Sequence, residues 1–182
     1  MKLIQSLVGG GLMALFCFCG GAHAGFLTDA DKDWQEEAEV PFPPAPKEAD
    51  LHRFYVSATT PNAFFIDMAT LSVGQDGVVR FVMVVRSPRG ASNITFEGIR
   101  CASSQRRLYA IGQADGTWVA SRNTAWEGIS FNTYNRAQAA LAKEYFCDGT
   151  TATAIDADEV RRRIEKGTAR GFNPALDEQG RM

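Results

Sequence analysis

Residues 64–86 read FFIDMATLSVGQDGVVRFVMVVR, two runs of apolar and β-branched residues separated by Gln75-Asp76-Gly77. Asp-Gly between two such runs is a strong hairpin signal, because glycine tolerates the positive φ that tight turns require. Along the second run the side chains alternate between two faces, Phe81, Met83 and Val85 against Arg80, Val82, Val84 and Arg86. The stretch therefore predicts two antiparallel strands joined by a tight turn.

The pattern continues on both sides of this hairpin. A second Asp-Gly, Asp115-Gly116, separates two further apolar runs, and the short connections 88–92 and 102–105 suit antiparallel neighbours. We therefore predict an antiparallel meander of about six strands, at 51–57, 64–74, 77–87, 93–101, 106–113 and 117–122.

Two helices are expected after the strands. Asn135 can cap a helix over 136–146, whose largely apolar stripe could lie across the sheet: Ala137, Ala140, Leu141, Glu144 and Tyr145. A charged helix is expected over 154–166, with acidic residues early and basic residues late, as the helix dipole favours. Its apolar stripe is narrow, which predicts a peripheral position.

Residues 1–24 read as a secretory leader. An apolar stretch runs from Leu3 to Cys19, and Ala22-His23-Ala24 offers the small-x-small pattern that a signal peptidase accepts. We expect cleavage between Ala24 and Gly25 and export to the periplasm or out of the cell. Glycines interrupt the run too often for an uncleaved anchor, and no later segment is long and apolar enough to span a bilayer.

Two cysteines, Cys101 and Cys147, remain after the leader. In an oxidising compartment an isolated pair is most simply a disulfide, and this one would staple the end of the fourth strand to the end of the helix. A zinc site or a catalytic thiol would need histidine partners, and His52 is the only histidine left. The predicted fold class is therefore α+β: an antiparallel β-meander with one helix packed on it, one disulfide and a peripheral C-terminal helix.

The segment after the leader differs from the rest of the chain. Residues 25–50 are acidic and then proline-rich, which favours extended polyproline conformation. They could form a partner-docking arm, or a stiff spacer or strap packed on the domain, and the large side chains of Trp34 and Phe42 indicate that part of the segment docks. We divide the chain into leader 1–24, arm 25–50, α+β domain 51–150, and charged helix with loose tail 151–182.

The charge of the chain disfavours nucleic acid as a partner. The formal net charge is −2, and removing the leader takes away one lysine, so no basic surplus is left to neutralise phosphates. Arg161, Arg162 and Arg163 could meet anionic lipid or an acidic partner, but the acidic residues interspersed with them favour a solvated helix face.

The sequence offers little material for catalysis. His52, next to Arg53, is too isolated to indicate a triad, and two-histidine metal motifs cannot be built. Four carboxylates could do acid–base work, but no spacing brings two of them together: Asp67, Glu97, Glu127 and Glu144. No glycine-rich phosphate loop follows the leader, so neither a metal nor a cofactor is indicated.

Four aromatic side chains are candidates for a small-molecule groove: Tyr109, Trp118, Trp126 and Phe131. The alternative is that they fill the core between the sheet and the helix.

Several motifs together resemble a known family. They are Phe96–Cys101, Tyr109–Gly112, Asp115–Trp118, Trp126 and Tyr145–Cys147. In these motifs the chain resembles the CNP-like family of uncharacterised proteobacterial envelope proteins, over roughly Phe54 to Cys147. The resemblance implies a Gram-negative exported protein and assigns no catalytic residue, and it leaves the arm and the charged tail outside.

These observations favour a non-enzymatic periplasmic protein that binds other envelope components. A protein that binds a lipid or metabolite in the aromatic groove is the first alternative. A carboxylate-dependent cell-wall hydrolase using Glu97, Glu127 or Glu144 is the second. The oligomeric state is not indicated by the sequence.

Overall fold

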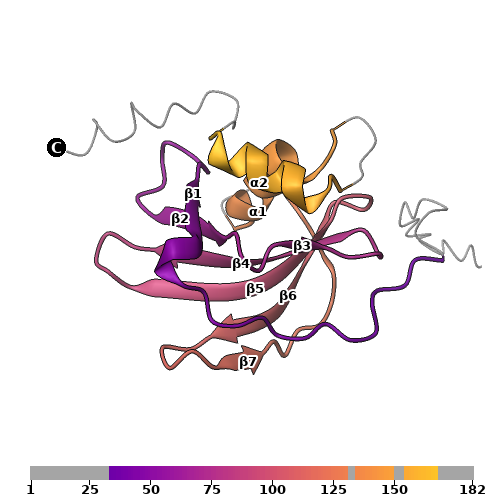
Figure 1. Cartoon of the computed structure of the whole chain (residues 1–182), viewed down its shortest axis with the longest axis horizontal. Helices are drawn as coiled ribbons and strands as arrows, with labels where there is room; N and C mark the ends of the chain where they lie inside the picture. Colours follow the sequence, from indigo (N-terminus) through magenta and orange to yellow (C-terminus); the bar gives the residue numbers. More distant parts are fainter. Residues whose placement is uncertain (1–32, 131–133, 150–153, 168–182) are drawn as a thin grey trace, which may run out of the picture.

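The structure is a computed structural model that describes residues 33–130, 134–149 and 154–167. Within these residues the chain forms one eight-stranded sheet and a small set of helices (Figure 1). In chain order the elements are η2 (Glu48–Asp50), β1 (Leu51–Phe54), β2 (Ala63–Asp67), β3 (Ser72–Val73), β4 (Val78–Arg86), β5 (Ser92–Arg100), β6 (Gln105–Gly112), β7 (Trp118–Ala120), β8 (Glu127–Gly128), α1 (Arg136–Ala140), η3 (Leu141–Phe146) and α2 (Ala157–Glu165).

The sheet is the predicted antiparallel meander, in the order β1-β2-β4-β5-β6-β7. The strand count was wrong: β3 pairs with β4 and β8 pairs with β6, so the sheet has eight strands instead of about six. The predicted strand 64–74 divides because the Asp67 side chain accepts hydrogen bonds from Ala69 N at 3.2 Å and from Thr70 Oγ1 at 2.9 Å. These bonds turn the chain between β2 and β3.

Both Asp-Gly turns lie where they were expected. Gly77 has a φ of 75° and Gly116 a φ of 85°, values that a residue with a side chain rarely adopts. The aspartate before each glycine accepts a hydrogen bond from the amide two residues on, Val78 N for Asp76 and Thr117 N for Asp115. The first turn joins β3 to β4 and the second joins β6 to β7.

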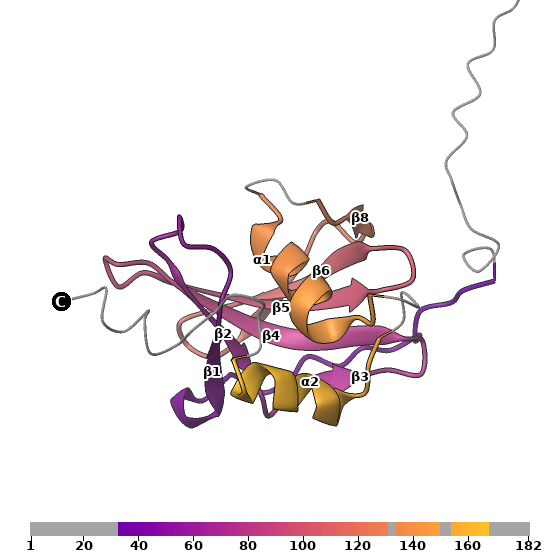
Figure 2. The same ribbon diagram turned by 90° about the horizontal axis from the view of Figure 1, so that it is seen from above.

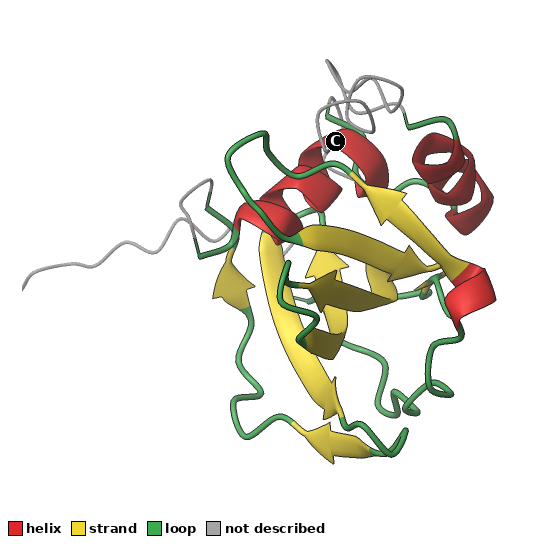
Figure 3. Cartoon of the chain, turned by 90° about the vertical axis from the view of Figure 1, so that its left-hand side faces the viewer, coloured by secondary structure: helices red, strands yellow, loops and turns green. Residues whose placement is uncertain are grey.

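The central strand β4 is covered on both faces. On one face Val79, Phe81 and Met83 belong to the main core with residues of η3 and α2. On the other face Val82 packs with Phe96 and Tyr109 in a smaller cluster that also contacts Val40. The helices therefore lie along one side of the sheet (Figure 3), and a different part of the chain covers the opposite side.

That second cover is the segment 33–50, which we call the strap. Figure 1 shows it in indigo, crossing the sheet on the side away from α1 and α2 before it enters η2 and β1. The sequence left open a docking arm, a stiff spacer or a strap, and in residues 33–50 the structure shows a segment packed on its own domain. Phe42 remains 47% exposed, whereas Trp34 is partly buried against the sheet.

The helix predicted over 136–146 is present but divided. It begins as α1 and continues as η3, a π-helical segment in which Cys147 N donates to Ala142 O. The wider winding allows the adjacent residues Tyr145 and Phe146 both to be fully buried with Leu141. Asn135 stands at the N-cap position, yet its side chain makes no capping bond and donates instead to Gly128 O at 3.1 Å.

The helix α2 is less peripheral than its sequence predicted. Asp156 caps it by accepting from Glu159 N at 2.9 Å, and Val160 and Ile164 are buried in the main core. Arg161 donates to Met68 O and to Leu71 O, which fixes the helix to the turn between β2 and β3 (Figure 2). No helix in the described ranges is long and apolar enough to cross a membrane.

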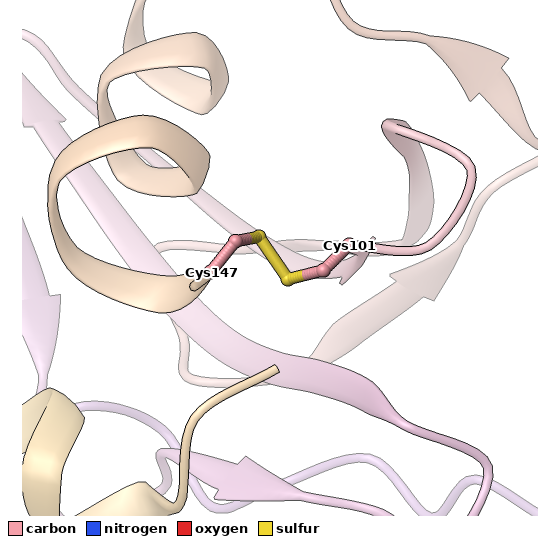
Figure 4. Close-up of a disulfide and its surroundings, with 2 residues drawn as sticks. All are labelled: Cys101 and Cys147. Atoms are coloured by element: carbon pink, nitrogen blue, oxygen red, sulfur yellow. A yellow bond between two sulfur atoms is a disulfide. The ribbon is translucent and has the colours of Figure 1, made fainter. Parts of the chain in front are cut away.

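The predicted disulfide between Cys101 and Cys147 is present (Figure 4). Cys101 directly follows β5 and Cys147 directly follows η3, so the bond fixes the end of the helical layer to the end of a central strand. The two cysteines are separated by 46 residues, and closing a loop of that size restricts the unfolded chain considerably.

Replacing both cysteines by alanine should lower the free energy of unfolding by up to about 4 kcal/mol, the value expected for a loop of this length. Denaturant unfolding of the wild type and of the double variant measures the difference. Intact mass before and after reduction and alkylation is the companion measurement. Two free thiols in the native protein would contradict the pairing.

Candidate functional site

Polar and aromatic side chains gather where the strap crosses the sheet. We call this side of the sheet the strap face. The strap carries three prolines between Pro41 and Pro44, which lack N–H donors, so it is held mainly by side chains instead of by a backbone ladder. Its contacts fall into three groups along its length.

The first group surrounds the carboxylate of Glu36. Tyr109 Oη donates to Glu36 Oε1 at 2.6 Å, Arg107 Nη1 pairs with Oε2, and Trp126 Nε1 donates to the same oxygen at 3.3 Å. Burial, and then the neighbouring Glu36, raise the pKa of Tyr109, so its hydroxyl remains a donor. One strap carboxylate thus joins three side chains of the sheet and its following loop.

Trp34 anchors the same end of the strap. Its Nε1 donates to Asp76 O at 2.8 Å, and its ring meets that of Trp126 edge-on with centroids 5.6 Å apart. The guanidinium of Arg100 lies 4.0 Å from the centre of the Trp34 ring. At that distance the ring face attracts the cation.

The second group joins the strap to the β3–β4 turn. Arg80 Nη1 and Nη2 donate to the two oxygens of Asp76 at 3.1 and 2.5 Å, and Glu37 lies 3.4 Å from the same guanidinium. Glu37 also accepts from Gln75 N at 2.9 Å. Burial alone would raise the pKa of Asp76, but the hydrogen bonds from Arg80 and from the backbone outweigh it and lower the pKa. The aspartate therefore stays ionised and serves both the turn and the strap.

The third group holds the proline-rich half. Trp118 Nε1 donates to Pro43 O at 2.7 Å, and Arg86 forms a bidentate pair with Glu48 at 2.9 and 2.5 Å. A cavity of about 550 Å³ lies between Val40–Pro44 of the strap and the sheet, with Val73, Arg80 and Phe96 among its other lining residues.

The predicted groove residues therefore meet the chain's own strap. Tyr109, Trp118 and Trp126 all donate hydrogen bonds to strap atoms, and they lie on the side of the sheet away from the helices. The alternative that they fill the core between sheet and helix is wrong for these three. Phe131 lies outside the described residues, as do Ala24 and Gly25 at the expected cleavage point.

The structure does bring two of the candidate carboxylates near one another. Arg106 donates to Glu127 Oε2 at 2.8 Å and lies 3.9 Å from Glu97 Oε2. Glu97 is buried and accepts from Thr95 Oγ1 at 2.7 Å and from Gln138 Nε2 at 2.9 Å, so it connects β5 to α1. Burial raises the pKa of Glu97, and its hydrogen-bond donors only partly offset this effect.

The remaining candidates lie apart from this cluster. Asp67 forms the β2–β3 turn, and Glu144 pairs with Lys143 at 3.3 Å. His52 lies in β1 opposite Ile66. Within the described residues no group of three or more histidine, cysteine, aspartate or glutamate side chains could hold a metal ion.

Sequence reasoning missed Glu36, Glu37 and Glu48 as contact residues, and with them Arg80, Arg86 and Arg107. A signal for these contacts was present: each arginine occupies a strand position in a mainly apolar run, and an acidic segment precedes the strands. Charged residues inside a sheet require partners when they are buried.

The fold and the strap face define a class of protein: a disulfide-stapled α+β domain whose sheet is covered by helices on one side and by its own N-terminal strap on the other. The sequence profile of the CNP1-like family matches residues 29–165 of this chain. The chain therefore belongs to the CNP1-like family, as its motifs indicated. The match extends beyond those motifs and takes in the strap and α2.

One relative is the protein named "Cryptic neisserial protein 1" of Neisseria gonorrhoeae (strain ATCC 700825 / FA 1090). It is 30% identical over 124 residues, which cover 61% of this chain and 59% of the relative. The chain thus matches less than two thirds of the relative's length. No solved structure matches the chain.

Replacing Glu36 by glutamine should loosen the strap. The substitution removes the charge that pairs with Arg107 and should lower the free energy of unfolding by about 1–3 kcal/mol, the usual range for hydrogen bonds to charged groups. Hydrogen exchange of the strap amides should become faster. Glu39→Gln is the control, since Glu39 is exposed and has no hydrogen bond to another described residue. Equal effects of the two variants would contradict the role of Glu36.

The buried Glu97 should make stability depend on pH. Because its pKa is raised above the ordinary value of 4.5, the folded protein keeps a proton that the unfolded chain releases. The stabilisation that comes from the protonated Glu97 is complete below about pH 4.5. It is lost as the pH rises through the folded pKa, and the free energy of unfolding then falls by up to about 1.4 kcal/mol per pH unit.

Glu97→Gln removes this titration and tests the assignment. The free energy of unfolding of the wild type minus that of the variant should fall as the pH rises between about pH 4 and pH 8. Denaturant unfolding at several pH values measures it. A difference that stays constant over the range would show that Glu97 is ionised in the folded protein.

Proposed function

We propose that this chain is an exported, non-enzymatic component of the cell envelope that binds other envelope proteins. The observation that carries the proposal is the strap face, where arginine and aromatic side chains hold an extended, acidic, proline-containing segment. Grooves that recognise extended peptides use the same means, aromatic donors for proline-rich backbone and arginines for acidic side chains. The strap face thus has the chemistry of a peptide-binding surface.

Two further features support export. The leader pattern of residues 1–24 directs a chain out of the cytoplasm, and a disulfide such as Cys101–Cys147 persists in oxidising compartments. Membership of the CNP1-like family is compatible with this location. We place the protein in the periplasm or outside the cell.

Capture of partners from the envelope tests the proposal. The tagged full-length chain is expressed in its own host, cross-linked reversibly in intact cells and purified with whatever it holds. We expect the same envelope protein in independent repeats. Failure to capture one, together with normal envelope assembly in a strain lacking the gene, would overturn the proposal.

Strap variants then locate the partner. Glu36→Gln should raise the amount captured if the partner uses the strap face, because a loosened strap competes less. Glu39→Gln, outside the strap contacts, should capture the wild-type amount. Capture that is equal for all three chains would place the partner on another surface.

A second candidate function is suggested by the cavity beneath the strap. Its volume of about 550 Å³ lies in the range of small-molecule sites, and Val40, Val73 and Phe96 give it apolar walls. A lipid or metabolite there would lie close to Trp118, which packs on Phe96. Native mass spectrometry of protein from its own host should then show a bound mass. A bare mass, with tryptophan fluorescence unchanged by a panel of lipids and metabolites, would exclude this function.

A further inference from the structure

A second, smaller cavity lies on the helical side of the molecule. It has a volume of about 300 Å³ and is lined by residues of the loop between β1 and β2 and of the start of α1. Val56, Thr59, Thr60, Asn62, Phe64 and Arg136 contribute to its walls. The volume is at the lower end of the range for small-molecule sites, so a small molecule fits it and a polypeptide does not.

Arg136 brings a positive charge to this cavity. Its Nη1 donates to Thr59 Oγ1 at 2.9 Å and to Ser57 Oγ at 3.4 Å, and the two hydroxyls are 2.9 Å from each other. Both acceptors are neutral. Among the residues that the structure describes, no carboxylate pairs with Arg136, and its Nη2 and Nε have no hydrogen-bond partner.

Other arginines of the domain are placed differently. Arg80, Arg86, Arg106 and Arg107 each pair with a carboxylate in the described structure. In Arg136 the hydroxyls fix one nitrogen of the guanidinium and leave two donors in the fork geometry that matches a carboxylate or a phosphate. An anionic partner for this cation is therefore expected from outside the described residues.

The neighbouring groups suit the same kind of ligand. Thr60 Oγ1 accepts from Asn62 N at 3.4 Å, which leaves the hydroxyl proton of Thr60 free to donate. Val56 and Phe64 add apolar wall beside these donors, which suits the carbon skeleton of a small organic molecule.

We propose that this cavity binds a small organic molecule that carries an oxyanion group, a carboxylate or a phosphate. Nη2 and Nε of Arg136 donate to two oxygens of the group, and the threonine hydroxyls fix the arginine in place. Val56 and Phe64 of this site pack on the core beneath the helices, whereas the strap packs on the cluster of the opposite face. The site therefore neither requires the strap face nor depends on the binding of an envelope protein.

Titration of the ¹⁵N-labelled full-length chain tests the proposal. Sodium lactate and sodium phosphate serve as the two probes, each compared with sodium chloride at the same ionic strength. We expect saturable shifts of the amides of Thr59, Thr60 and Asn62 with at least one probe, and the stronger probe distinguishes carboxylate from phosphate. Amide shifts that have not saturated at a probe concentration of about 50 mM would show only very weak binding and would overturn the proposal.

Two substitutions of Arg136 distinguish binding by the two donors of the guanidinium from binding by positive charge alone. Arg136→Gln should weaken binding at least tenfold, and Arg136→Lys should weaken it less, because lysine keeps the charge and loses the fork. Arg89→Ala, in the exposed β4–β5 turn, should bind as the wild type does. Unchanged binding by Arg136→Gln, or an equal loss in Arg89→Ala, would contradict the site. If Arg136→Gln folds poorly, Arg136→Lys replaces it in the test, and binding equal to that of the wild type would then contradict the site.

Discussion

The structure depends on one constraint: β4 is buried on both of its faces. Every residue from Val78 to Val84 is buried, so the sheet needs a cover on each side. Helices supply one cover through Leu141, Tyr145 and Phe146. The other is the strap, which has no helix or strand before η2, and its length and its side chains allow it to serve as a layer. The strap is thus a structural part of the domain and not an appendage to it.

The means of holding the strap follow from its composition. A proline-containing segment cannot join the sheet as a further strand, because it lacks the donors of a ladder. Glu36, Glu37 and Glu48 instead reach arginines of β4 and β6, and Trp118 donates to a proline carbonyl. Burying charges costs desolvation energy, so such pairs fix the register of the strap more than they add to stability. Removing one partner of such an ion pair therefore destabilises the fold by more than the net contribution of the pair.

Features that depend on local sequence were predictable, and those that depend on distant partners were not. The Asp-Gly turns, the alternating strands and the cysteine pair follow from neighbouring residues and from compartment. The predicted strand 64–74 is divided because the Asp67 side chain accepts a hydrogen bond from the nearby backbone. The π-helical segment η3 allows Tyr145 and Phe146 to be buried together. Tyr109, Trp118 and Trp126 were predicted as groove residues, but their contacts with the strap were not foreseen. Arg106, which joins Glu97 to Glu127, was missed because no spacing rule connects strands that far apart.

The position of the strap in the chain has a consequence for the order of assembly. Its partners come much later in the sequence: Asp76 follows Glu37 by 39 residues, and Trp126 follows Glu36 by 90. The segment that is synthesised before the sheet therefore cannot dock until the sheet exists. Closing such long loops is entropically costly, and the helix α2 has the same cost, since Arg161 reaches Met68 across 93 residues. The strap is held mostly by side chains, with a backbone bond from Met68 N to Asp50 O at its end, so a local opening of this layer would expose one sheet face while the disulfide keeps the helical side in place.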